Sequence, residues 1–161
     1  KELLFDLLKF SVLIGIATLS PLIGNQMITG SIVNATLFIA VMFLGYRNAL
    51  AVGLIPSLIA LASGTLPVVL APMIPFIILG NGILVLVFEF LRKKNYWLAI
   101  VSASALKFIF LLGTSSIVVG LLLKGQIAKN VALMMSYPQL ITALAGGMIA
   151  YLFFKAVYFK K

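Results

Sequence analysis

Apolar runs long enough to cross a lipid bilayer occupy almost all of this chain. A bilayer core takes about 20 apolar residues of helix. Of 161 residues, 63% are hydrophobic and only 9% are charged, and a soluble core of this size could not bury that much apolar surface. No run alternates with a period of two residues, which disfavours a transmembrane β-barrel. We therefore expect an all-α integral membrane protein with residues 1–161 forming one domain.

Glycine, asparagine and basic residues divide the apolar sequence into about six segments. Most are close to the length that a transmembrane helix needs. No polar stretch between them is long enough to form a domain outside the membrane. The predicted spans are residues 3–23, 29–46, 49–63, 66–91, 95–123 and 131–158.

The basic residues predict the orientation of this bundle. The chain has 12 Lys and Arg against three Asp and Glu, a net charge of +9. They lie at the ends of apolar runs rather than in one patch, so we expect no nucleic-acid partner. With six spans, Lys124 and Lys129 lie on one side and most others on the opposite side, so the positive-inside rule predicts cytoplasmic N- and C-termini. The basic residues on the predicted cytoplasmic side are Lys1, Lys9, Arg47, Arg92, Lys93, Lys94, Lys155, Lys160 and Lys161.

Lys107 lies near the middle of the fifth predicted span, between Leu106 and Phe108. A charge at the bilayer centre costs about 3 kcal/mol on insertion scales, and such residues usually face a protein interior or a wet cavity. The alternative is a lysine that extends its apolar stem toward the membrane surface. That is easier near a helix end, and Lys107 is far from both ends of its span. We therefore expect Lys107 to face an internal polar site.

Other polar residues fall at the same outer depth as Lys107. At 100° per residue, Ser104, Lys107 and Thr114 occupy about a third of the circumference of their helix. Such a convergent set predicts a pocket for a small-molecule substrate. The alternative is that each residue makes a hydrogen bond between helices, worth about 0.6 kcal/mol. The predicted substrate-binding residues are Lys107, Asn81, Tyr137, Gln139, Asn34, Gln26, Ser104 and Thr114.

Most catalytic chemistry lacks the necessary side chains. The chain has no His and no Cys, and Glu2, Asp6 and Glu89 all lie toward the predicted cytoplasmic side. General acid–base catalysis and metal binding are therefore not expected, and neither is a cofactor. A dyad of Ser104 and Lys107 remains conceivable. No Gly-x-x-x-x-Gly-Lys-Ser/Thr motif is present, so we expect neither an enzyme nor self-powered transport.

Small residues recur at helical spacing in the first and third predicted spans. Ser11 and Gly15 are four residues apart, as are Ala49, Gly53 and Ser57 along their own segment. Ribbons of this kind allow helices to approach closely. They serve either packing within the chain or docking to another membrane subunit, and the spacing is compatible with both.

With these features the chain resembles the substrate-binding S components of energy-coupling factor (ECF) transporters, the prokaryotic importers of vitamins and micronutrients. The resemblance rests on chain length, about six helices, internal termini, basic inner loops and the outer polar cluster. It implies a multi-pass protein of the prokaryotic plasma membrane that binds a small molecule from outside, with residues 24–28 helping to close the pocket. It also implies a transmembrane coupling subunit and ATPase subunits as partners. The implied docking residues are Ser11, Gly15, Ala49, Gly53 and Ser57, with Ser11 and Gly15 standing where the family often has two alanines.

Two other functions fit the same composition. A stand-alone facilitator would have a polar stripe through the whole membrane thickness, whereas the inner halves of these spans are apolar. A structural or ion-pathway subunit of a larger membrane complex would use Lys107 in a charge relay. That relay would need buried acids, which this chain lacks unless a partner supplies them.

Overall fold

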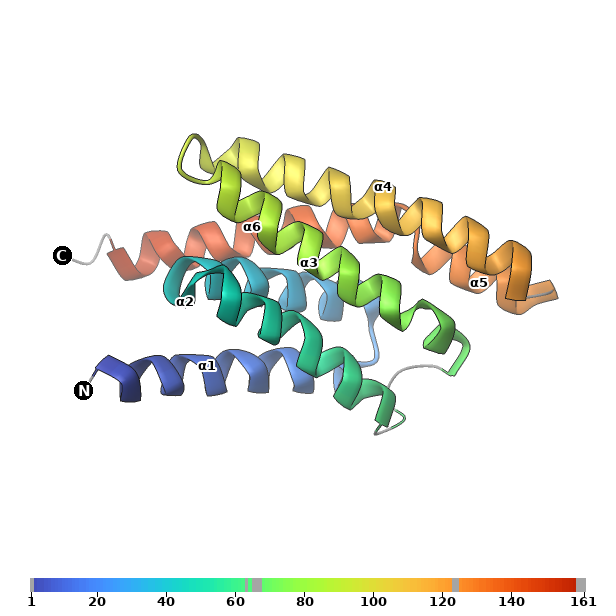
Figure 1. The fold of residues 1–161 in the computed structure, drawn as a ribbon, viewed down its shortest axis with the longest axis horizontal. Helices are drawn as coiled ribbons and strands as arrows, with labels where there is room; N and C mark the ends of the chain where they lie inside the picture. Colours follow the sequence, from blue (N-terminus) through green and yellow to red (C-terminus); the bar gives the residue numbers. More distant parts are fainter. Residues whose placement is uncertain (1, 63, 65–67, 123–124, 159–161) are drawn as a thin grey trace.

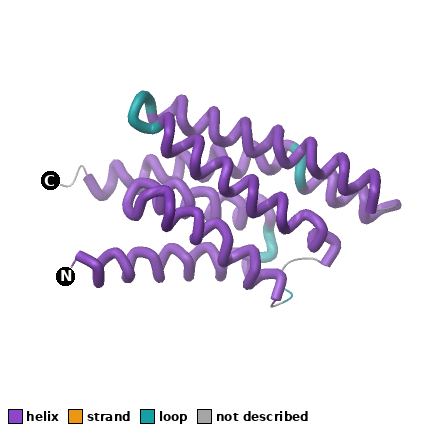
Figure 2. Tube along the Cα trace, viewed as in Figure 1, coloured by secondary structure: helices purple, strands orange, loops and turns teal. Residues whose placement is uncertain are grey.

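A computed structural model describes residues 2–62, 64, 68–122 and 125–158. These residues are helical except at short connections, and they include no strand, as Figure 2 shows. Five stretches are long and apolar enough to cross a membrane. The predicted all-α membrane fold is therefore confirmed at this level. Four of the lysines that predict the orientation lie outside the described residues: Lys1, Lys124, Lys160 and Lys161. The predicted span ends at 63, 66–67 and 123 also lie outside them.

The helices begin and end near the glycine, asparagine and basic residues that were predicted to separate the spans. Asn25 precedes α2, and its Oδ1 accepts hydrogen bonds from the backbone N–H groups of Met27 and Ile28 at 2.9 and 3.2 Å. Such an N-cap satisfies donors that have no partner within the helix. The elements are α1 (Glu2–Leu19), η1 (Ser20–Ile23), α2 (Gln26–Ala62), η2 (Val68–Met73), α3 (Ile74–Leu91), α4 (Tyr96–Leu122), α5 (Gly125–Met134) and α6 (Tyr137–Tyr158).

Helix α2 reverses direction within its length, so it forms two arms rather than one straight rod (Figure 1). Gly45 has φ 77° and ψ 167°, angles that interrupt the helix. Positive φ is accessible to glycine because it has no Cβ. Residues 26–44 form the first arm and residues 46–62 the second, close to the predicted spans 29–46 and 49–63.

The last predicted span differs from the structure. We expected one helix over residues 131–158, but α5 already begins at Gly125 and α6 only at Tyr137. Met135 and Ser136 separate the two helices, which both lie within one of the five candidate membrane-spanning stretches, Gly125–Val157. Pro138 follows at the second position of α6, where a proline is tolerated because no helical hydrogen bond is lost. This interruption places a non-helical turn beside the candidate site.

The helices pack into an elongated bundle with both termini at one end (Figure 1). That half of the bundle has a core of packed apolar side chains, in which Phe38 and Phe88 meet edge to face with ring centroids 4.7 Å apart. Helix α6 crosses α2 closely, since a Cβ on Gly146 would lie 2.7 Å from the backbone nitrogen of Ala35. Small residues at such crossings are typical of membrane helices.

Large apolar side chains cover the outside of the bundle. Leu3, Phe90 and Leu121 are 74%, 76% and 78% exposed. In water this surface would favour aggregation, whereas lipid tails solvate it. The structure is therefore that of a multi-pass membrane protein.

Candidate functional site

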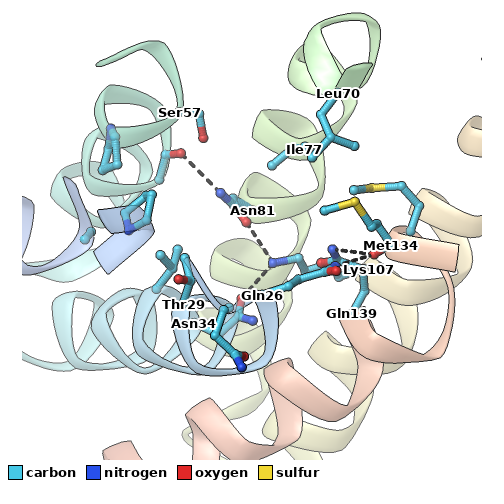
Figure 3. A pocket seen from close by; sticks show the side chains of 18 of the residues that line it. Gln26, Thr29, Asn34, Ser57, Leu70, Ile77, Asn81, Lys107, Met134 and Gln139 are labelled. Carbon is cyan, nitrogen blue, oxygen red and sulfur yellow. Dashed lines mark hydrogen bonds between the residues drawn. The ribbon is translucent and has the colours of Figure 1, made fainter. Parts of the chain in front are cut away.

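A cavity of about 310 Å³ is lined by residues of several elements, among them the α5–α6 junction, which lies toward the end of the bundle opposite the termini (Figure 1). Its described lining residues come from α1, the η1–α2 junction, both arms of α2, η2, α3, α4 and the α5–α6 junction (Figure 3). The break before α6 and the short η helices bring backbone and side chains inward here. Non-helical backbone at membrane depth is tolerated where it lines a cavity or is buried in protein.

Lys107 reaches this cavity from α4 and is 3% exposed. Its Nζ donates hydrogen bonds to Asn34 Oδ1 at 2.6 Å and to Asn81 Oδ1 at 2.8 Å, as Figure 3 shows. Both partners are neutral amides that also line the cavity. The expectation that Lys107 faces an internal polar site is confirmed.

The two asparagines extend the network to neighbouring helices. Asn81 Nδ2 donates to the backbone oxygen of Gly53 at 3.2 Å, and Asn34 Nδ2 donates to Thr142 Oγ1 at 3.4 Å. One chain of hydrogen bonds thus connects both arms of α2 with α3, α4 and α6. Buried polar groups need such partners, because an unsatisfied one costs about 1–3 kcal/mol.

Two glutamines meet at the α5–α6 junction on the other side of the cavity. Gln26 Nε2 and Gln139 Nε2 both donate to the backbone oxygen of Met134, at 2.7 and 3.1 Å. This carbonyl belongs to the end of α5, where helical partners are lacking. The contact joins the start of α2 to the start of α6 across the cavity.

Three predicted site residues lie elsewhere. Tyr137 is 60% exposed, and neither it nor Ser104 nor Thr114 is among the residues that line the cavity. Thr114 Oγ1 donates to the backbone oxygen of Phe110 at 2.8 Å. Thr114 shares a helix face with Lys107 but lies about 10 Å further along the axis, so its hydroxyl bonds within its own helix. The structure does not place these three residues at the cavity, and their part in substrate binding stays a prediction.

The structure places part of the predicted docking surface inside the chain. Ala49 and Gly53 are buried inside the chain, and Ser57 lines the cavity. A Cβ on Gly53 would lie 3.2 Å from Asn81 Cβ, so this ribbon of small residues packs α2 against α3. Ser11 is exposed, and a Cβ on Gly15 would meet no atom within 4 Å. Those two positions on α1 stay a docking prediction.

Sequence reasoning missed the apolar wall of the cavity. Nothing marks these side chains in a chain where most residues are apolar. Pro21, Pro56 and the prolines around η2 were the available signal, since non-helical backbone at membrane depth is tolerated where it lines a cavity. The apolar wall includes Val33, Pro56, Leu70, Ile77, Met134 and Met135.

The geometry suits binding more than bond chemistry. No group of three His, Cys, Asp or Glu residues within the described ranges could hold a metal ion. The Ser104 hydroxyl is buried and has no hydrogen-bond partner among the described residues, so the conceivable dyad with Lys107 is not formed. What the cavity offers is one cation, several amide groups and an apolar wall.

Comparisons of this chain with protein-family models, with curated proteins and with solved structures found no match.

Proposed function

We propose that the chain is the substrate-binding membrane subunit, or S component, of a prokaryotic ECF-type importer. In this proposal it captures a vitamin-like small molecule on the outer side of the plasma membrane and delivers it to an ATP-driven partner module. The observation that supports this proposal most strongly is the cavity of about 310 Å³ around Lys107 at one end of the bundle. Ligand pockets start at about this size and combine apolar walls with a few placed polar groups.

The proposed topology has six crossings and cytoplasmic termini. The reversal of α2 at Gly45 divides its 37 residues into two arms of near-spanning length. The end with the termini also carries the α2 reversal and the α3–α4 connection (Figure 1). Arg47 and residues 92–94 lie in these two turns, and Lys155 is in the last turn of α6. This clustering of positive charge supports a cytoplasmic location for that end, which leaves the cavity on the outer side.

The same features disfavour a stand-alone facilitator. Beyond Lys107, the half of the bundle near the termini is filled by buried apolar side chains, including Phe38, Leu84 and Phe88. A polar path through the whole membrane is not formed by the described residues. A subunit that binds its substrate and depends on a partner for release fits a cavity closed on that side.

Purification from the native host tests this role. A tagged chain extracted gently into lipid nanodiscs should be isolated with a second integral membrane subunit and with ATPase subunits. The isolated complex should hydrolyse ATP, whereas the chain alone should not, because it has no nucleotide-binding motif. The proposal would be wrong if liposomes containing only this chain accumulated a substrate against its gradient.

A further inference from the structure

We infer that the cavity binds a small organic anion with one acidic group and an aliphatic body, in the simplest case a monocarboxylate. This inference names the substrate class for the proposed binding function and therefore rests on it. It is carried by three properties of the cavity: its charge, the composition of its wall and its size.

The cavity has one basic side chain and no acidic one among the described residues that line it. Lys107 is the one ionisable side chain among the described residues that line it. Of the acids, Asp6 pairs with Lys9 at 2.9 Å and Glu89 with Arg92 at 2.7 Å. Glu2 begins α1, and its side chain is not among those described. A buried charge without an opposite charge is destabilising, so a ligand that supplies one negative charge would be favoured.

The Lys107 ammonium also has a hydrogen-bond donor left over. An ammonium group has three N–H donors, and the structure uses two of them on Asn34 and Asn81. The remaining donor belongs to a side chain that lines the cavity. A carboxylate oxygen is a stronger acceptor for this third N–H than a neutral oxygen, because hydrogen bonds between two charged groups are shorter and stronger than those between neutral groups.

The wall of the cavity predicts the rest of the ligand. The chain contains 12 Phe, five Tyr and one Trp, yet no aromatic side chain is among the described residues that line the cavity. The wall therefore offers no ring on which a flat aromatic ligand or an organic cation could stack. Branched and thioether side chains such as Ile77, Leu70 and Met134 instead suit an aliphatic or alicyclic body.

The size of the cavity limits the ligand further. At about 30 Å³ per water, a volume of 310 Å³ holds roughly ten water-sized groups. A ligand body of about ten non-hydrogen atoms fits this space, which is at the lower end of the size range of ligand pockets. Divalent cations are disfavoured as well, because they require oxygen ligands that include carboxylates, and the described lining has none.

A matched probe panel tests the inference on the full chain in zwitterionic nanodiscs. The three probes are cyclohexanecarboxylate, cyclohexanecarboxamide and cyclohexylamine, which share one ring and differ in charge. Binding is measured by calorimetry and by the shift in thermal unfolding. We expect the carboxylate to bind at least tenfold more tightly than the amide, and the amine not to bind.

Lys107→Met should weaken carboxylate binding by about 10- to 150-fold, while Lys129→Met should not change it, because Lys129 is exposed on α5.

The wild-type panel decides the question even if Lys107→Met fails to fold. Equal or tighter binding of the amide or the amine would overturn the substrate class and leave the proposed binding function standing. Failure of all three probes, together with a co-purified molecule that is neutral or cationic, would have the same meaning. Failure of all three probes with no co-purified molecule would overturn both proposals.

Discussion

At the scale of single residues, Lys107 has a structural role as well as a proposed binding role. Its ammonium bridges Asn34 and Asn81, and those amides in turn hold Thr142 and the Gly53 carbonyl. Removing one member of such a network leaves its partners unsatisfied, which costs more than removing the partners together. The network therefore predicts strong energetic coupling between its members.

The first prediction measures this coupling between Lys107 and Asn81. Asn81→Leu should destabilise the protein by about 1–3 kcal/mol, because it removes the hydrogen bond to the Gly53 carbonyl and leaves one Lys107 donor without a partner. The double variant with Lys107→Met should be less destabilised than the sum of the two single variants. Thermal unfolding in nanodiscs measures all three. Strict additivity would mean that the hydrogen bond contributes nothing to stability.

Sequence reasoning identified the centre of the site and not its boundary. Lys107, Asn81 and Asn34 could be predicted because polar groups at membrane depth are costly and therefore conspicuous. Tyr137 and Thr114 do not line the cavity, because position on a helix face does not determine depth or the direction of a side chain. Apolar lining residues such as Ile77 could not be found, since they differ in no way from side chains that contact lipid.

At the scale of elements, the helix interruptions determine the architecture. Gly45 turns α2 back on itself, and the break at Met135–Ser136 separates α5 from α6. Gly45 lay at a predicted span boundary, because glycine, an aromatic and an arginine follow one another there. The early start of α5 was not predicted, because residues 125–130 are polar enough to resemble a loop.

The second prediction tests the proposed orientation of these elements. The chain has no native cysteine, so single cysteines can be introduced without background. Gln126→Cys and Lys93→Cys place a thiol at exposed positions toward opposite ends of the bundle. A membrane-impermeant thiol reagent added to intact cells should label position 126 and not position 93. Labelling of position 93 alone would mean that the orientation is inverted.

The third prediction concerns the crossing of α6 over α2. Gly146→Ala should destabilise the protein by about 1–3 kcal/mol, because the new Cβ would lie 2.7 Å from the backbone nitrogen of Ala35 and the helices would have to separate. Gly113→Ala is the matched control, since a Cβ there would meet no atom within 4 Å. Unfolding of both variants in nanodiscs gives the comparison. Equal stability of the two would show that the crossing is looser than described.

At the scale of the whole molecule, the bundle has two unlike halves. The half near the termini is packed with apolar side chains such as Phe88 and Leu84, while the other half contains the cavity and the shorter helical pieces. All-helical character and membrane location follow from composition alone. The cavity does not, because its volume depends on how η2, α5 and the two arms of α2 meet in space.

The most direct test of the binding function is native mass spectrometry of the gently extracted protein. Wild type and Lys129→Met should each carry one co-purified small molecule, while Lys107→Met should be ligand-free and keep a folded, thermally stable bundle. Met keeps the apolar stem and removes a costly buried charge, which offsets the loss of the hydrogen bonds to Asn34 and Asn81, so folding should survive. The contradicting result is a Lys107→Met protein that keeps the same bound molecule as wild type, or a wild-type protein that carries none.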